Sequence, residues 1–175
     1  MILLDPDLDP DPAPKATSAK RTVASSKNLR LPAARTLARF LALAQAAVRL
    51  KGEVTVLLTT DAAIRKMNRK FRGKNQATDV LSFPSEGPIC GSPAEKIAGD
   101  LAISVPTARR QAVEQHHSLS TEIKVLILHG LLHLSGYDHE ADKGKMARCE
   151  RLLRTRLGLS QSLIERVDAT KAKRP

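Results

Sequence analysis

The sequence predicts an α+β fold, in which a single domain packs helices on a small mixed β-sheet. Its 175 residues, 42% of them hydrophobic, are enough for one domain with a proper core. All segments with strand character from residue 50 onward end by residue 105, and three helical segments then follow one another. Strands early and helices clustered late are typical of an α+β layer arrangement.

Residues 1–27 are predicted to form a flexible N-terminal extension. From Asp5 onward this region is rich in Asp, Pro, Ala, Ser and Lys and lacks any hydrophobic period. Four prolines also prevent a regular helix in it: Pro6, Pro10, Pro12 and Pro14. The alternative to a wholly flexible segment is a short strand at 21–24.

The later elements follow from hydrophobic periodicity and from boundary residues. Pro32 opens a helix that runs to about residue 50, and Thr60 caps a helix that Gly73 ends near residue 71. Three segments have strand character: 53–58, 80–83 and 97–105. Three further helices are predicted: 106–117, 120–135 and 141–157.

Two histidines lie on the most apolar of these helices. His129 and His133 are four residues apart, so their rings stack one turn above each other on one face. Gly136 is placed to end the helix, and the turn after it can bring His139 back towards the pair. A lone buried histidine is more often a hydrogen-bonded core residue, but three at this spacing favour a metal site.

Three histidine ligands with an open fourth position are typical of catalytic zinc. The spacing matches the metzincin proteases in its three histidines and its glycine. In those proteases a glutamate that follows the first histidine is the general base, whereas Gly130 stands at that position here. This difference argues against peptide hydrolysis by the metzincin mechanism. The sequence therefore predicts a zinc site at the end of a buried helix, with hydrolysis of another electrophile open.

The stretch from His129 to His139, HGLLHLSGYDH, resembles the signature of the YbeY family of bacterial metal-dependent endoribonucleases, also called rRNA maturation factors. Two further blocks resemble that family. Asn68-x-x-Phe71-Arg72-Gly73-Lys74 is followed by TDVLSFP at 78–84, and the third block is GDLAIS at 99–104. The resemblance covers about residues 50–157 and leaves the long N-terminal segment out.

The resemblance implies a zinc-dependent endoribonuclease specific for single strands, which acts in 3′-end maturation of small-subunit (16S) rRNA and in ribosome quality control. It implies four catalytic residues, the one zinc being held by the histidines: Arg72, His129, His133 and His139. Arg72 would stabilise charge on the phosphate, because a guanidinium stays charged and forms two parallel hydrogen bonds to phosphate oxygens. The catalytic domain is predicted to span 28–160, followed by a basic tail at 161–175.

Composition limits the partners. With 29 Lys and Arg against 18 Asp and Glu, the net charge of +11 suits a polyanion, and the metal motif favours RNA and the ribosome over DNA. Aromatic residues are only 2% of the chain, so RNA is expected to be held mainly by charge. No basic, apolar leader and no run of roughly 18 apolar residues is present, which predicts a cytoplasmic protein without a membrane span.

The sequence leaves alternative roles open for three aspartates, and it assigns the remaining histidines and cysteines no part in the site. Asp79 and Asp100 are each interpreted as a second-sphere partner, a turn cap or the general base, with water as the other candidate base. Asp138 either orients an imidazole or stabilises a turn. His116 and His117 are interpreted as surface residues, and Cys90 and Cys149 as free thiols.

Two other functions compete with RNA cleavage. One is a metalloprotease with metzincin-like ligand spacing. The other is a ribosome-assembly binding protein with a structural zinc.

Overall fold

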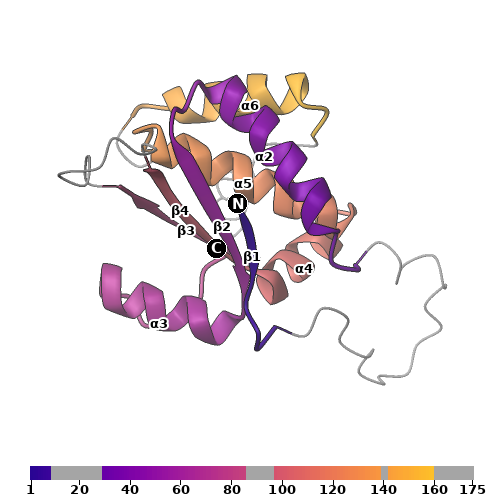
Figure 1. The fold of residues 1–175 in the computed structure, drawn as a ribbon, viewed down its shortest axis with the longest axis vertical. Coiled ribbons are helices and arrows are strands. Elements are labelled where there is room, and N and C mark those ends of the chain that lie inside the picture. The colour runs from indigo at the N-terminus through magenta and orange to yellow at the C-terminus, as the bar shows by residue number, and fades with distance from the viewer. Residues whose placement is uncertain (9–28, 86–96, 139–141, 160–175) are drawn as a thin grey trace, which may run out of the picture.

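Four strands form one mixed sheet in the computed structural model, which describes residues 1–8, 29–85, 97–138 and 142–159 (Figure 1). The strands are β1 (Ile2–Leu4), β2 (Glu53–Thr59), β3 (Val80–Pro84) and β4 (Ile97–Ser104). They lie in the order β1-β2-β4-β3, with β1, β2 and β4 parallel and β3 antiparallel to β4. The mixed sheet of the predicted α+β fold is confirmed.

Five helices accompany the sheet in the described part of the chain: α2 (Ala34–Val48), α3 (Asp61–Arg72), α4 (Val105–Glu114), α5 (Leu119–Leu134) and α6 (Lys145–Arg156). The boundaries of α3 follow the predicted caps, since the Thr60 hydroxyl accepts a hydrogen bond from Ala63 N and Gly73 ends the helix at φ 68°. α6 begins four residues later than predicted. None of these helices combines the length and apolar character needed to cross a membrane.

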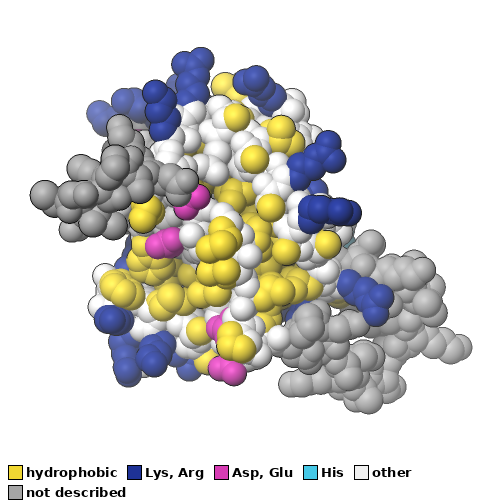
Figure 2. Space-filling view, in the orientation of Figure 1, with side chains coloured by type: hydrophobic (Ala, Val, Ile, Leu, Met, Phe, Trp, Pro, Cys, Tyr) yellow, Lys and Arg dark blue, Asp and Glu magenta, His cyan; other side chains and the backbone are white. Residues whose placement is uncertain are grey.

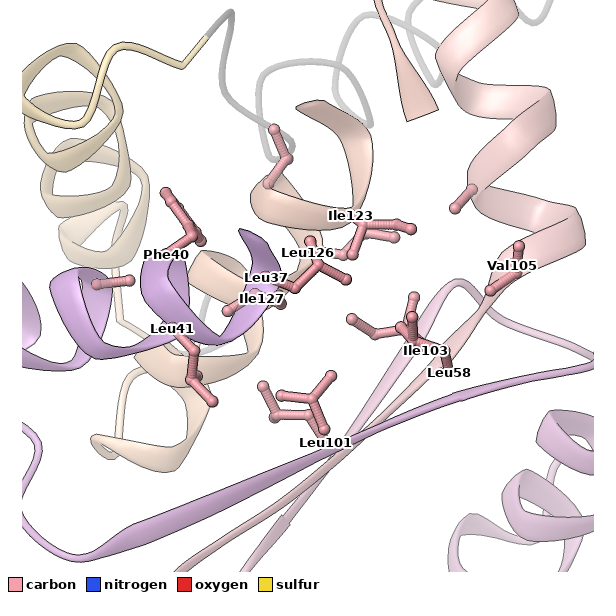
Figure 3. Packing of buried hydrophobic residues seen from close by; sticks show 14 of the residues in the cluster. Leu37, Phe40, Leu41, Leu58, Leu101, Ile103, Val105, Ile123, Leu126 and Ile127 are labelled. Carbon is pink, nitrogen blue, oxygen red and sulfur yellow. The ribbon is translucent and has the colours of Figure 1, made fainter. Parts of the chain in front are cut away.

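The main core lies between one face of the sheet and the helices α2 and α5 (Figures 1 and 3). Alternate residues of β2 and β4 point into it, because side chains along a strand point to opposite faces. Figure 3 shows apolar side chains from both helices and both strands meeting there: Leu37, Phe40, Leu41, Leu58, Leu101, Ile103, Ile123, Leu126 and Ile127. α5 is thus fixed directly on the sheet.

Helix α3 packs on the opposite face of the sheet (Figure 1). Its buried residue Ile64 contacts a small cluster that includes Leu81 of β3 and Ala102 of β4. α6 packs on the outer side of α5 through Met146 and Leu153. Both faces of the central strands are therefore covered, and the described elements form a single small domain.

The N-terminal residues differ from the prediction of a flexible extension over 1–27. Residues 2–4 form β1, which pairs in parallel with β2 so that Ile2 lies opposite Val56. Leu8 is buried in the main core, and the Met1 ammonium donates to Val54 O at 2.5 Å. The prediction is wrong for residues 1–8, because edge pairing and one buried leucine hold them on the sheet. The segments 9–28, including the alternative strand at 21–24, and 160–175 lie outside the described residues.

Candidate metal centre

Helix α5 is mostly buried and carries His129 and His133 near its C-terminal end. Ser118 caps its start by accepting a hydrogen bond from Thr121 N at 3.1 Å, and the residues from Ile123 to Leu132 are buried except Lys124. Gly130 lies against the sheet, where a Cβ would come within 2.7 Å of Leu101 Cδ2. The glycine thus permits a close approach of α5 to β4.

Gly136 ends α5 in a way that also orients His133. Gly136 has φ 87°, and its N–H donates to His133 O at 2.9 Å while Tyr137 N donates to Leu132 O at 3.1 Å. This pair of bonds is a Schellman motif, which requires a left-handed residue at Gly136. The motif places the Tyr137 carbonyl 3.0 Å from His133 Nδ1. Since a carbonyl can only accept, the proton of a neutral His133 ring lies on Nδ1.

His129 is oriented by a carboxylate from another helix. Glu150 of α6 places Oε2 3.0 Å from His129 Nδ1, and its Oε1 accepts a hydrogen bond from Arg154 Nη1 at 3.0 Å. All three side chains are buried, with relative exposures of 8% for His129, 0% for Glu150 and 2% for Arg154. The carboxylate accepts from Nδ1–H, so a neutral His129 ring also carries its proton on Nδ1.

The two rings turn their other nitrogens towards each other. His129 Nε2 and His133 Nε2 are 3.1 Å apart, and the ring planes cross at 72°. With both protons on Nδ1, two lone pairs face one another, an arrangement that a shared cation stabilises. Zinc–nitrogen distances of about 2.0–2.1 Å in tetrahedral geometry require ligand nitrogens about 3.3 Å apart. The pair therefore fits two ligand positions of one metal ion.

The third predicted ligand, His139, lies outside the described residues. Within the residues that are described, no group of three or more His, Cys, Asp or Glu side chains is arranged to hold a metal. The two helical histidines are thus the part of the predicted site that the structure brings together.

Arg72 is the last residue of α3, on the other face of the sheet from α5. Its side chain is exposed, and neither a hydrogen bond nor an ion pair joins it to His129 or His133. The C-terminal ends of α3 and α5 both lie on the β3 side of the molecule (Figure 1). In this view the end of α3 that carries Arg72 lies on the same side of the molecule as the C-terminal end of α5, on opposite faces of the sheet.

The three aspartates singled out from the sequence have different surroundings. Both carboxylate oxygens of Asp79 accept hydrogen bonds, Oδ1 from Val80 N at 2.8 Å and Oδ2 from Gln111 Nε2 at 3.0 Å, as a turn cap would. Asp100 is exposed and precedes Leu101, which points to α5, so Asp100 lies on the α3 face. Asp138 is exposed, while Tyr137 and Glu150 are the acceptors at the Nδ1 atoms of the two described histidines.

The interpretation of His117 as a surface residue is wrong. Its ring Nε2 contacts the Glu122 carboxylate, whose side chain is fully buried, and the His117 side chain is only 11% exposed. A buried carboxylate needs such a partner, which draws the ring inward. His116 is exposed, as predicted. Cys149 is a free thiol, and Cys90 lies outside the described residues.

Glu150 and Arg154 were not predicted as site residues from the sequence. The available signal was the helical spacing of Met146, Glu150 and Leu153, which puts a carboxylate on the apolar stripe of α6. A charged residue at a core position of an amphipathic helix needs a buried partner. Nothing in the sequence identifies that partner, because His129 is 21 residues away and on another helix.

Comparisons with known proteins agree with the motif. The family model described as Endoribonuclease YbeY matches residues 16–158. A curated relative named Endoribonuclease YbeY from Solibacter usitatus is 53% identical over 113 residues, which cover 65% of this chain and 71% of that protein. Its namesake from Koribacter versatilis is 48% identical over 130 residues, covering 74% and 81%. A solution structure from Thermotoga maritima gives a TM-score of 0.45 at 25% identity, covering 69% of this chain and 80% of that one.

The family model extends over most of the chain, well beyond the three motif blocks. The matched residues 16–158 include β2, β3, β4 and the helix that carries the histidines, but not β1. This protein therefore belongs to the endoribonuclease YbeY family.

Proposed function

We propose that this protein is a zinc-dependent endoribonuclease that cleaves single-stranded RNA in 3′-end maturation of small-subunit rRNA and in ribosome quality control. Family membership supports the RNA-cleaving activity. The observation that carries the metal dependence is the pair of Nε2 atoms 3.1 Å apart, with both Nδ1 atoms held by acceptors. Such a donor pair suits a borderline-soft divalent metal such as zinc.

The proposed ligands are His129, His133 and His139, of which the last rests on the motif alone. When bound, zinc would supply Lewis acidity for a phosphoryl oxygen and lower the pKa of a coordinated water. The chain itself contributes two pre-oriented imidazoles, because the Tyr137 carbonyl and the Glu150 carboxylate fix both rings. Pre-orientation of this kind lowers the entropic cost of binding the metal.

Arg72 is proposed to bind the phosphate that undergoes cleavage. Its guanidinium is exposed at the end of α3 and makes no ion pair with another described residue, which leaves it available to an RNA phosphate. A guanidinium can donate two parallel hydrogen bonds to phosphate oxygens as negative charge develops on them. Arg72 would then act from the α3 side of the β3 edge while the histidines act from the α5 side.

The surface of α3 suits the rest of an RNA strand. Figure 2 shows Lys and Arg side chains gathered over α3, at the lower left of this view. Five exposed cations belong to that helix: Arg65, Lys66, Arg69, Lys70 and Arg72. Their combined field attracts a phosphate backbone irrespective of base sequence.

The metalloprotease alternative meets a steric obstacle at Gly130. A glutamate there would need a Cβ, which would overlap the buried Leu101 side chain at 2.7 Å. Leu101 would have to shift to admit the general base of the metzincin mechanism at its usual position, where this chain has glycine. The alternative of a binding protein with a structural zinc predicts the same metal but no turnover.

One experiment separates these three functions. The purified full chain is given labelled single-stranded RNA in one reaction and casein in another, each with and without a metal chelator. We expect cleavage of RNA alone, abolished by the chelator, restored by zinc and absent in His129→Ala. Cleavage of casein would support the protease, and stoichiometric zinc with neither activity would support the binding protein.

A further inference from the structure

We infer that Glu150, held in place by Arg154, is a positioning residue that sets the tautomer and direction of the His129 ring for metal binding. The inference rests on the proposed metal site and deepens it. His129 lies on α5, whereas Glu150 and Arg154 lie one turn apart on α6. The three side chains form one continuous buried series, joined by contacts of 3.0 Å between His129 and Glu150 and 3.0 Å between Glu150 and Arg154.

Packing alone gives no reason for this buried ion pair. The surrounding contact between α5 and α6 is apolar, made by Leu128, Leu132, Met146 and Leu153. Withdrawing a carboxylate and a guanidinium from water is costly, and apolar residues of similar volume commonly replace such pairs without loss of stability. The pair is therefore better explained by what it does to His129, which Glu150 contacts on α5.

The consequence for His129 is a defined proton position. Glu150 Oε2 accepts from Nδ1–H, so the lone pair of Nε2 is directed at the facing Nε2 of His133, 3.1 Å away. Without an acceptor at Nδ1, a neutral imidazole also populates the tautomer with the proton on Nε2, which cannot bind a metal there. A carboxylate also raises the donor strength of the ring more than the neutral Tyr137 carbonyl does for His133.

Arg154 has a separate part in the arrangement. It donates from Nη1 to Oε1 of Glu150, which leaves Oε2 directed at the histidine. Because the two residues are four apart on one helix, the guanidinium holds the carboxylate in a single rotamer. The ring of His129 is thereby aligned by α6, while the backbone of α5 itself aligns His133.

The test uses variants that remove the pair without leaving one charge buried. In the full chain, Glu150→Leu with Arg154→Met removes the acceptor at Nδ1, and Glu150→Gln with Arg154→Met keeps a neutral acceptor. Zinc affinity is measured by competition with a chromophoric chelator. We expect the Leu/Met variant to bind zinc about 10–100-fold more weakly than wild type and the Gln/Met variant to lie between them.

Glu122→Gln is the matched control. Glu122, also on helix α5, is likewise a fully buried carboxylate in contact with a histidine, His117, which precedes the helix. We expect this variant to lose stability while keeping the wild-type zinc affinity, which separates a general loss of folding from a loss of alignment.

A second measurement is independent of zinc and of activity. Long-range ¹H–¹⁵N NMR spectra of the metal-free protein report which ring nitrogen carries the proton. We expect the Nδ1–H tautomer for His129 in wild type, and a shift towards Nε2–H in the Leu/Met variant. If that variant does not fold, the wild-type spectrum decides, since an Nε2–H tautomer there overturns the inference.

The outcomes distinguish this inference from the proposed function. If wild-type protein binds no zinc, or if His129→Ala binds zinc as tightly as wild type, the proposed metal site is wrong. A different result overturns only the positioning role of Glu150. In that case wild-type protein binds zinc through His129, and the folded Leu/Met variant binds zinc with an affinity within about twofold of wild type.

Discussion

Arg72 is exposed and ends a helix, where a cation is stabilised by the helix dipole whatever else it does. Its charge is therefore compatible with a purely structural role. The geometry of its head group is not needed for that role, since lysine serves equally well at a helix end. Replacing Arg72 by lysine keeps the charge but changes the shape of the head group, so this substitution separates the effects of the two.

We expect Arg72→Lys to reduce RNA cleavage by about 100-fold or more, because an ammonium cannot form the paired hydrogen bonds to phosphate. Folding and zinc content should be unchanged. Single-turnover cleavage of labelled RNA is the measurement, and Arg69→Lys, in the same last turn, is the control. Activity of Arg72→Lys close to that of Arg69→Lys would reduce Arg72 to its position at the helix end.

Gly130 tests how closely α5 approaches the sheet. Alanine there gains about 1 kcal/mol of helix propensity but overpacks against Leu101, which costs about 1–3 kcal/mol. We expect a net loss of about 1 kcal/mol in urea unfolding for Gly130→Ala. In a Leu101→Ala background the obstructing atoms are gone, so the same substitution should be stabilising. The same sign in both backgrounds would contradict the close contact.

At this scale the sequence identifies residues whose roles depend on local spacing. His129, His133 and Gly136 belong to one helix and its end, so their geometry follows from helical periodicity. The hydrogen-bond partners of the two histidines were harder to predict from the sequence. The Tyr137 carbonyl is a backbone atom without a side-chain signal, and Glu150 becomes a partner only through the packing of α6 on α5.

The first residue of helix α3, Asp61, joins it by hydrogen bonds to the end of β4 and to α4. Asp61 accepts hydrogen bonds from Ser104, from Thr107 Oγ1 at 2.7 Å and from Arg110 Nη1 at 3.0 Å. Burial raises the pKa of the Asp61 carboxyl, but these hydrogen bonds and the Arg110 charge outweigh it, so the pKa lies below its ordinary value. The junction joins α3, which carries the exposed cations, to β4 and α4.

A carboxyl with a depressed folded-state pKa stabilises the fold above its unfolded pKa of about 3.9, and that contribution is lost as the pH falls through the folded value. We expect Asp61→Asn to lower stability by about 1 kcal/mol or less at pH 7. It should also flatten the loss of stability below about pH 4. Urea unfolding at several pH values measures both effects, with the exposed Asp7→Asn as control. A parallel pH profile for Asp61→Asn and wild type would contradict this role.

Most elements were predictable to within a few residues because caps and periodicity act locally. Thr60, Gly73 and the alternation in 97–104 are examples. β1 was not predictable, since three residues are too short to show alternation and an Asp- and Pro-rich tract follows them. The order of the strands in the sheet was not predictable either, because pairing between distant segments produces no local sequence pattern.

The whole molecule carries a net charge of +11, and its cations over α3 lie on the other side of the sheet from α2. If these cations hold RNA, the logarithm of affinity should fall linearly with the logarithm of salt concentration, by about 0.7 per phosphate contacted. Binding should also depend little on base sequence, given few aromatic side chains for stacking.

We expect the double variant Lys70→Ala and Lys74→Ala to weaken RNA binding uniformly across sequences and to reduce the salt slope by about 1. Zinc content should not change. Fluorescence anisotropy at several salt concentrations is the measurement. Replacing the exposed Arg35 and Arg39 of α2 by alanine removes the same charge and should leave the slope unchanged. Affinity that does not respond to salt would instead assign recognition to another partner.

The parallel pairing of β1 with β2 has a consequence for synthesis of the chain. Ile2 lies opposite Val56, so 54 residues must be translated after Ile2 before its partner exists. At about 5–20 residues per second, this takes roughly 3–11 seconds. During that interval the apolar residues Ile2, Leu3 and Leu4 have no strand to pair with. Codon choice between β1 and β2 therefore sets how long a nascent-chain chaperone can compete with the sheet for them.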